Sequence, residues 1–251
     1  MSGHSKWATI KHQKGAKDKA RGKLFAKLIR QIEVSAREGG GDIEANPTLR
    51  SMVAKAKGAS VPNDTIDRAI KRGTGELEGV TYESITYEGY APGGVAMLVD
   101  VLTDNRNRAG AEVRTTFSRL GGSLAEPGAV SWQFTRRGVL IVPNKFTEDE
   151  VMEAAVEAGA DDVVDEGDSW RITCEPSAVE TVRESLEKAG ITVDSAESTM
   201  ISSTTVPLET AEDAKKVLRI IDAFEEHDDV QDVYSNFDIP DKILAAISVE
   251  A

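Results

Sequence analysis

Basic side chains crowd the first thirty residues of the chain, where nine lysines and arginines stand against one acidic residue, Asp18. The nine are Lys6, Lys11, Lys14, Lys17, Lys19, Arg21, Lys23, Lys27 and Arg30. A merely solvated surface would interleave acids with these cations, as residues 148–157 do. Here the counter-charge has to come from another molecule, and the polyanion we expect is a nucleic acid, whose phosphates release counterions on binding. The predicted chemistry is therefore phosphate binding.

Two ring side chains, Trp7 and His12, lie inside this basic run. A flat ring beside lysines can stack on an exposed base or ribose, as recognition of single-stranded RNA often requires. Alternatively, Trp7 packs against the following helices as a hydrophobic anchor. We keep both rings, together with the basic residues from Lys6 to Lys27, as candidate nucleic-acid contacts.

A second candidate site is the polar run of residues 103–108, Thr-Asp-Asn-Arg-Asn-Arg, which follows an apolar strand pattern. Asp104 or Asn105 is expected to cap a helix that starts here. Arg106 and Arg108 would then project from the helix N-terminus, where positive charge opposes the macrodipole. Locally unfavourable charge is typical of functional sites, so the arginines are candidate contacts for phosphate or an acidic partner. Intramolecular ion pairs with the acidic remainder of the chain fit the pattern equally well.

Other charged runs are predicted to be solvated turns. Residues 136–138, Arg-Arg-Gly, read as the turn of a hairpin between strands at 130–134 and 139–142. The acidic runs at 161–168 and 225–229 lack the spacing of an EF-hand loop, so no metal site is predicted there.

Nothing in the sequence supports catalysis. With three histidines and one cysteine, a nucleophile and its base are hard to assemble, and the common phosphate-loop, hydrolase and zinc-protease motifs are missing. We expect a protein that is not an enzyme and has no cofactor. Cys174 cannot form an internal disulfide, and no apolar run approaches the roughly twenty residues of a membrane span. The prediction is a cytoplasmic protein without a membrane partner.

Charge is distributed unevenly along the chain, whose formal net charge is -13. Residues 1–75 hold 16 basic and seven acidic residues, a net charge of +9, whereas residues 76–251 hold 14 and 36, a net charge of -22. A polyanion is therefore attracted to the first segment and repelled by the second.

Three short helices are predicted in the first 75 residues. Residues 2–19 lack a sustained apolar face and are expected to be extended or partly ordered. From Lys23 the apolar spacing is helical up to the glycines at 39–41. Asn46 and Pro47 begin a second helix, and a third runs from about residue 63 to Gly73. Each helix has one apolar face, which predicts a small bundle.

Beyond a linker near residue 75 the pattern changes to pairs of strands followed by single helices. This order favours an α+β fold with antiparallel sheets. Residues 139–200 hold the order β-α-β-β-α-β of a ferredoxin-like domain, and the pieces on either side would complete another. We predict a basic helical domain at 1–77, a discontinuous α+β domain at 78–135 with 204–251, and an inserted α+β domain at 136–203.

Several long motifs in this order resemble the YebC/PmpR family, essentially from end to end. They lie at residues 1–14, 61–71, 87–95, 103–108 and 121–134. The resemblance implies a helical N-terminal domain followed by two α+β domains, and a cytoplasmic protein usually described as a probable DNA-binding transcriptional regulator. Mitochondrial relatives act as translational activators, and bacterial relatives have been linked to relief of ribosome stalling. The N-terminal basic motif and residues 103–108 carry over as candidate binding positions.

Two functional hypotheses follow. In the first, the chain regulates transcription and the basic segment binds DNA backbone phosphates. In the second, it is a ribosome-associated translation factor that binds ribosomal or transfer RNA and relieves stalled translation. The sequence makes no prediction of oligomeric state.

Overall fold

The computed structural model describes residues 17–249, apart from the side chains of residues 17–21, 241, 245, 248 and 249. The described chain forms two compact units. One runs from Ser131 to Thr205, and the other joins the segments before and after it. The larger unit contains a three-helix region and an interrupted α+β domain. The smaller unit is the inserted domain.

The three-helix region confirms the helices expected before residue 75. They are α2 (Lys17–Gly39), α3 (Pro47–Gly58) and α4 (Asn63–Thr74), packed around buried Leu28, Ile32, Leu49, Val53 and Ile66. α2 begins at Lys17, so the prediction that the chain stays extended or partly ordered through residue 19 is wrong for Lys17 to Lys19. Lysine, alanine and arginine are good helix formers and extend α2 beyond its apolar face.

Asn46 joins the end of α2 to the start of α3, as its predicted capping role requires. Its Oδ1 accepts a hydrogen bond from the Leu49 backbone N at 3.0 Å. Its Nδ2 donates to the backbone oxygens of Ser35 and Gly40, both at 2.9 Å. One buried amide thus satisfies polar groups at both helix ends.

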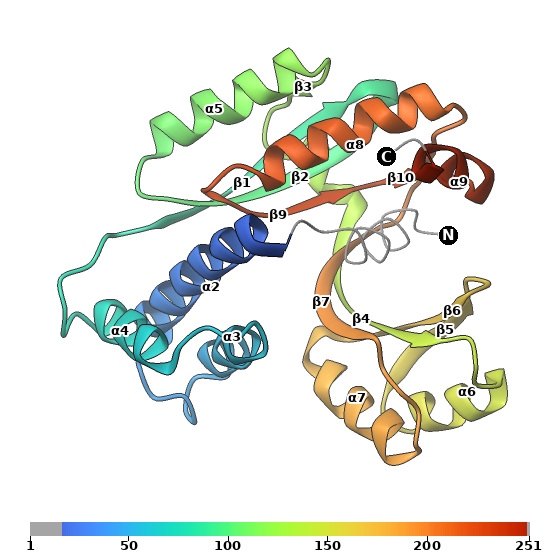
Figure 1. The fold of residues 1–251 in the computed structure, drawn as a ribbon, viewed down its shortest axis with the longest axis horizontal. Helices are drawn as coiled ribbons and strands as arrows, with labels where there is room; N and C mark the ends of the chain where they lie inside the picture. Colours follow the sequence, from blue (N-terminus) through green and yellow to red (C-terminus); the bar gives the residue numbers. More distant parts are fainter. Residues whose placement is uncertain (1–16, 250–251) are drawn as a thin grey trace. The chain divides into compact units, whose positions relative to one another are not determined.

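The interrupted domain is a four-stranded antiparallel sheet with the order β3-β1-β2-β9, covered on one face by α5 and α8 (Figure 1). Its elements are β1 (Glu83–Ala91), β2 (Val95–Thr103), α5 (Arg106–Arg119), β3 (Ser123–Leu124), α8 (Ala211–Glu225) and β9 (Val230–Ser235). A short parallel pair, β8 (Val206–Pro207) with β10 (Phe237–Asp238), and a final helix, α9 (Asp241–Val249), complete it.

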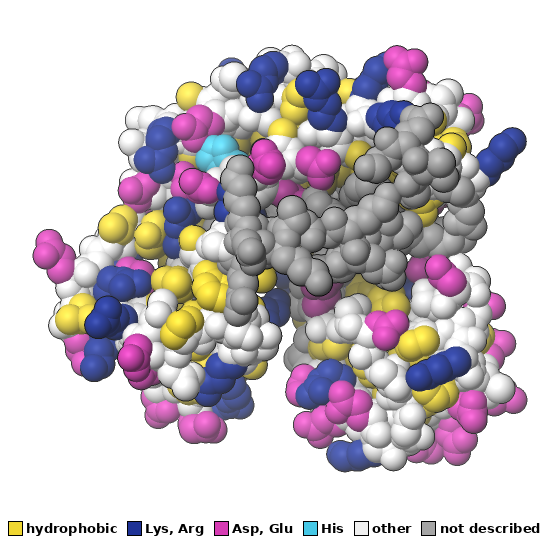
Figure 2. Space-filling model, viewed as in Figure 1, with side chains coloured by type: hydrophobic (Ala, Val, Ile, Leu, Met, Phe, Trp, Pro, Cys, Tyr) yellow, Lys and Arg dark blue, Asp and Glu magenta, His cyan; other side chains and the backbone are white. Residues whose placement is uncertain are grey.

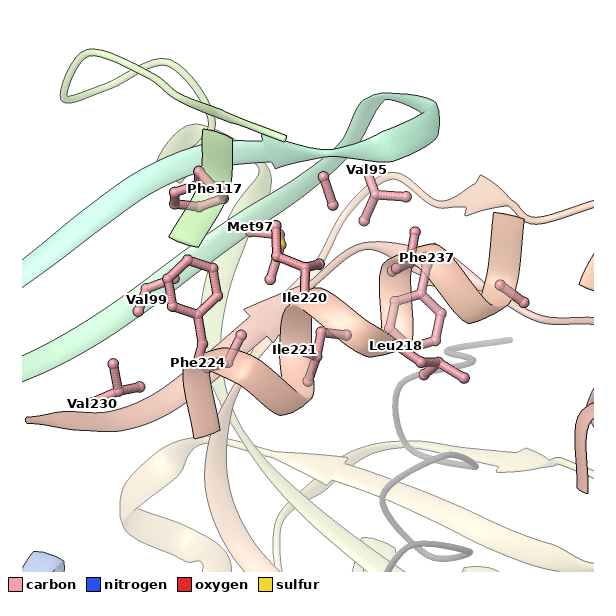
Figure 3. Close-up of a cluster of buried hydrophobic side chains, with 14 of the residues drawn as sticks. Val95, Met97, Val99, Phe117, Leu218, Ile220, Ile221, Phe224, Val230 and Phe237 are labelled. Atoms are coloured by element: carbon pink, nitrogen blue, oxygen red, sulfur yellow. The ribbon is translucent and has the colours of Figure 1, made fainter. Parts of the chain in front are cut away.

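The core of this domain lies between the sheet and the two helices (Figure 3). Alternate residues of β2, among them Met97 and Val99, point toward α5 and α8. The rings of Phe117 on α5 and Phe224 on α8 meet edge to face, with centroids 4.7 Å apart. Because the apolar stripe of each helix is buried here, its polar residues face outward.

The inserted domain has the predicted β-α-β-β-α-β order and the strand order β5-β6-β4-β7. Its elements are β4 (Phe134–Pro143), α6 (Glu148–Val156), β5 (Ala160–Asp165), β6 (Ser169–Cys174), α7 (Val179–Lys188) and β7 (Ser195–Ser202). All neighbouring strands are antiparallel. The α+β fold, with one such domain inserted in another, is confirmed.

Residues 136–138 do not form the hairpin turn that the sequence suggested. They lie inside β4, which pairs with β7 continuously from Phe134 to Ile141. Gly138 packs closely there, because a Cβ in its place would lie 2.5 Å from Val179 Cγ2 and 2.6 Å from Cys174 Sγ. The glycine serves this close approach inside a strand, a role that a turn glycine does not share.

Candidate nucleic-acid interface

The predicted binding residues fall into three groups. Lys6, Trp7, Lys11, His12 and Lys14 lie outside the described residues. The backbones of Lys17, Lys19 and Arg21 belong to the first turns of α2, and their side chains are not described. The structure therefore places four of the predicted side chains: Lys23, Lys27, Arg106 and Arg108.

Lys23 and Lys27 contact the C-terminal end of α8. Lys23 Nζ donates to the backbone oxygen of Glu226 at 2.5 Å, and Lys27 Nζ donates to that of Glu225 at 3.3 Å. The last carbonyls of a helix lack intrahelical partners and carry the negative end of its dipole. These two lysines therefore stabilise the contact between α2 and α8 and are not free for phosphate in this conformation.

Arg30, one turn further along α2, contacts the loop between α8 and β9. Its Nη1 donates to the backbone oxygen of Asp228 at 2.7 Å and to Asp229 Oδ1 at 3.0 Å. Its guanidinium carbon lies 5.7 Å from the centroid of the Tyr82 ring, within the range of a cation–π contact.

Asp229 is the centre of a polar cluster that we call the Asp229 cluster, consisting of Asp229, Arg30, Thr103 and Arg108. Its side chain is only 8% exposed. Besides Arg30, it accepts hydrogen bonds from Thr103 Oγ1 at 2.8 Å and from Arg108 Nη2 at 2.7 Å. Burial alone raises the pKa of the Asp229 carboxyl, but the hydrogen bonds from Arg108 and Thr103 and the charges of both arginines outweigh it, so the pKa is lowered.

Two members of the acidic runs are thus not solvated, contrary to the prediction. Asp229 is buried in the cluster, and Glu166 is buried beside Arg171, whose Nε donates to Glu166 Oε1 at 2.8 Å. A cation within hydrogen-bonding distance compensates the cost of burying each carboxylate.

The structure shows the intramolecular alternative for Arg108. Asn105 caps α5, with its Oδ1 accepting from the Arg108 backbone N at 3.0 Å. The Arg108 side chain then bridges Asp104 Oδ1 at 2.8 Å and Asp229. Arg108 therefore forms intramolecular ion pairs.

Arg106 behaves differently although it lies two residues away. Its side chain is exposed, and no hydrogen bond or ion pair joins it to another described residue. Of the four described predicted side chains, Arg106 is the one whose charge is left for a partner.

Sequence reasoning missed further basic residues on α5 and α8. Arg114 and Arg119 lie on α5, and Lys216 and Arg219 lie on α8, all exposed. Lys and Arg side chains gather over these two helices in Figure 2. The signal was present in α5, which holds four arginines and one acid, Glu112. The strongly acidic total of the chain after residue 75 concealed it.

The inserted domain carries the opposite charge. Residues 131–205 contain 16 acidic and six basic residues, a net charge of -10. Acidic side chains are visible over its α6 and α7 side in Figure 2. This domain repels a polyanion, which restricts candidate nucleic-acid contacts to the other unit.

Neither a group of metal-ligating side chains nor a membrane-spanning helix is found in the part of the chain that the structure describes. Within it, no group of three or more His, Cys, Asp or Glu side chains is arranged to hold a metal ion. None of the helices described is both long and apolar enough to cross a membrane. His227 instead lies 2.6 Å from Glu112, measured from Nε2 to Oε2.

Two family models match the chain. Residues 5–76 match the TACO1/YebC protein N-terminal domain, and residues 82–237 match the TACO1/YebC second and third domain. Together the matches cover the three-helix region and most of both α+β domains.

Similar proteins extend over the full length. A "Probable transcriptional regulatory protein" of Halothermothrix orenii is 56% identical over 253 residues, covering 100% of both chains. One of Rubrobacter xylanophilus, with the same name, is 58% identical and covers 99% of this chain and 100% of the relative. The crystal structure of a conserved hypothetical protein from Aquifex aeolicus, 47% identical, superposes with a TM-score of 0.78 over 90% of this chain and 94% of that chain.

Proposed function

The chain belongs to the TACO1/YebC family, and on that premise we propose that it is a nucleic-acid-binding regulator of gene expression, of the DNA-binding transcriptional kind. The names of its relatives support a role in transcriptional regulation. The observation that carries nucleic-acid binding is the division of charge, +9 in residues 1–75 against -22 in the remainder. Such a field draws a polyanion to one end of the chain.

Backbone phosphates, rather than base edges, are the target that the three-helix region favours. In a helix-turn-helix protein, the first residues of the second helix read bases in the major groove. α3 and α4 are joined by residues 59–62, but the start of α4 exposes Asp64 and Asp67. These carboxylates would face the phosphates at the groove edge and oppose entry. Binding would therefore depend on charge and shape more than on direct base contacts.

A second candidate is a ribosome-associated translation factor that binds ribosomal or transfer RNA. The acidic start of α4 favours it, because binding to structured RNA needs no helix in a major groove. The acidic inserted domain would then face solvent or a basic ribosomal protein.

The test compares two variants with the same net charge. In the first, Lys11, Lys14 and Lys17 are changed to Glu. In the matched control, Lys145, Lys188 and Lys242, which are exposed lysines of the α+β domains, are changed to Glu. We would measure binding of duplex DNA over a salt series, and sedimentation of the tagged full chain with ribosomal subunits in cell lysate.

Loss of three phosphate contacts is expected to reduce the salt-dependence slope for duplex DNA by about 2.7 in the first variant only. Recovery of promoter DNA that depends on Lys11, Lys14 and Lys17 supports transcriptional regulation. Co-sedimentation with ribosomal subunits that depends on the same lysines supports the translation factor. Equal behaviour of the two variants in both assays contradicts the proposed interface.

A further inference from the structure

A groove of about 740 Å³ lies between the C-terminal end of α5, the turn after β1, and α8. Its apolar lining is Pro92, Leu120 and Ala223, and its charged lining is Arg119, Lys216 and Arg219. No acidic side chain lines it. The volume is within the range of sites that hold a small molecule or one unit of a polymer.

Two of the three cations are not compensated. No hydrogen bond or ion pair joins the side chain of Arg119 or Arg219 to any residue that the structure describes. Lys216 is different, since its Nζ lies 2.8 Å from Glu212 Oε1 and 3.8 Å from Asp213 Oδ1. The groove therefore offers two free guanidinium groups and one ammonium held by neighbouring acids.

No ion pair or hydrogen bond with a described residue accounts for Arg219. A cation in the last turn of a helix is favourable, which accounts for Arg119 at the end of α5. Arg219 lies in the middle of α8, three residues after Lys216, where a pair of like charges is mildly unfavourable. Charge that the local structure does not need, at the edge of a groove, is typical of a binding site.

We propose that this groove binds the sugar–phosphate backbone of a nucleic acid, as a second contact surface separate from the N-terminal basic segment. The inference rests on the proposed function and deepens it by naming a further site. Two guanidinium groups can each donate paired hydrogen bonds to phosphate oxygens. Leu120 and Pro92 offer an apolar surface against which a ribose or a base can lie.

The test uses the full chain with Arg119 and Arg219 both changed to Ala. The matched control changes Lys145 and Lys188 to Ala, which alters the net charge equally on the acidic inserted domain. The probes are fluorescent oligouridine and oligothymidine, titrated over a salt series. A thiouridine-substituted oligomer is also photocrosslinked, and the attached peptides are mapped by mass spectrometry.

We expect the groove variant to reduce the salt-dependence slope for single strands by about 1.4, or about 0.7 for each lost phosphate contact. The control should leave the slope unchanged. Crosslinks should map to peptides containing Leu120 or Ala223, and free ATP at the same phosphate concentration should not displace the oligomer.

Other outcomes separate this inference from the proposed function. Equal slopes for wild type and groove variant, with binding retained, overturn the groove and leave the proposed function standing. Displacement by ATP assigns the groove to a free nucleotide and overturns binding of a polymer backbone. If the wild type binds neither these oligomers, duplex DNA nor ribosomes, the proposed function and the inference fail together.

Discussion

The Asp229 cluster and the α5/α8 groove each bring together arginines from elements that are far apart in the sequence. In the cluster, Arg30 and Arg108 share one buried carboxylate, 199 and 121 residues away. In the groove, Arg119 of α5 and Arg219 of α8 line one surface, and no described acid is paired with either. The same residue type therefore stabilises the fold in one place and is left for a ligand in the other. The deciding factor is a buried acid within reach.

The largest effect is expected on removing the shared carboxylate. Changing Asp229 to Ala removes the one acceptor that Arg30, Thr103 and Arg108 share. This should destabilise the protein by about 2–4 kcal/mol, a loss limited because both guanidinium groups are partly solvated. Urea unfolding measures this. Changing Asp104 to Ala, which removes only the exposed partner of Arg108, should cost less than about 1 kcal/mol. Similar losses for both variants would contradict a central role for Asp229.

The contribution of Asp229 to the free energy of unfolding should also depend on pH. Because the pKa of Asp229 is lower in the folded protein than its ordinary value of 3.8, its ionised form stabilises the fold above about pH 4. This contribution disappears as pH falls through the folded pKa. The difference in unfolding free energy between the wild type and Asp229→Asn should therefore be constant near neutral pH and narrow below pH 4. A difference that stays constant down to acid unfolding would exclude ionisation of Asp229 as its source.

Arg106 and Arg108 allow the same comparison within one helix turn, between an arginine without a described partner and one paired with acids. Arg108→Ala should destabilise the protein, because it removes a charged hydrogen bond to the buried Asp229 carboxylate. Arg106→Ala should change stability by less than about 0.5 kcal/mol, as is usual for an exposed side chain. In duplex DNA titrations the order reverses, with Arg106→Ala lowering the salt slope by about 0.9 and Arg108→Ala leaving it unchanged. A stability loss in Arg106→Ala would show that its charge also serves the fold.

The smallest stability effect is expected in the groove. Arg119→Ala and Arg219→Ala should each change the unfolding free energy by less than about 0.5 kcal/mol, in either direction. Losing Arg219 should even relieve its repulsion with Lys216 slightly. Thermal unfolding of each variant beside Arg30→Ala, which is expected to be clearly destabilised, makes the contrast direct. Destabilisation of Arg219→Ala comparable with that of Arg30→Ala would place the groove arginines in the same class as the cluster.

Much of the fold could be predicted because its signals are local. The helix expected to begin at Asn46 and Pro47 and the one expected from about residue 63 to Gly73 are observed almost where the sequence placed them, as α3 (Pro47–Gly58) and α4 (Asn63–Thr74). Asn46 and Asn105 cap helices as their side-chain chemistry suggests. Two-residue strands such as β3 carry no periodicity, so no sequence pattern predicts them. α9 has helical apolar spacing at Ile243, Leu244 and Ile247, so the sequence does contain a local signal for this helix.

The candidate site was harder to predict, because pairing is not local. Nothing near Lys23 or Lys27 in the sequence indicates that each will contact the end of a helix about two hundred residues later. Likewise, no pattern within residues 136–138 predicts that β7 will pair with them and keep them in a strand.

The sequence by itself determined the properties that are sums over residues or that depend on near neighbours in the chain. Net charge and its division between the first 75 residues and the remainder are sums over composition, and helices and strands follow from spacing within a few residues. Only the tertiary structure decided which cations are neutralised. Whether Arg108 binds a ligand or Asp229, and whether Arg119 and Arg219 line one groove, depends on distances between distant segments. Electrostatic interaction falls with distance and is strengthened by burial, and the fold sets both.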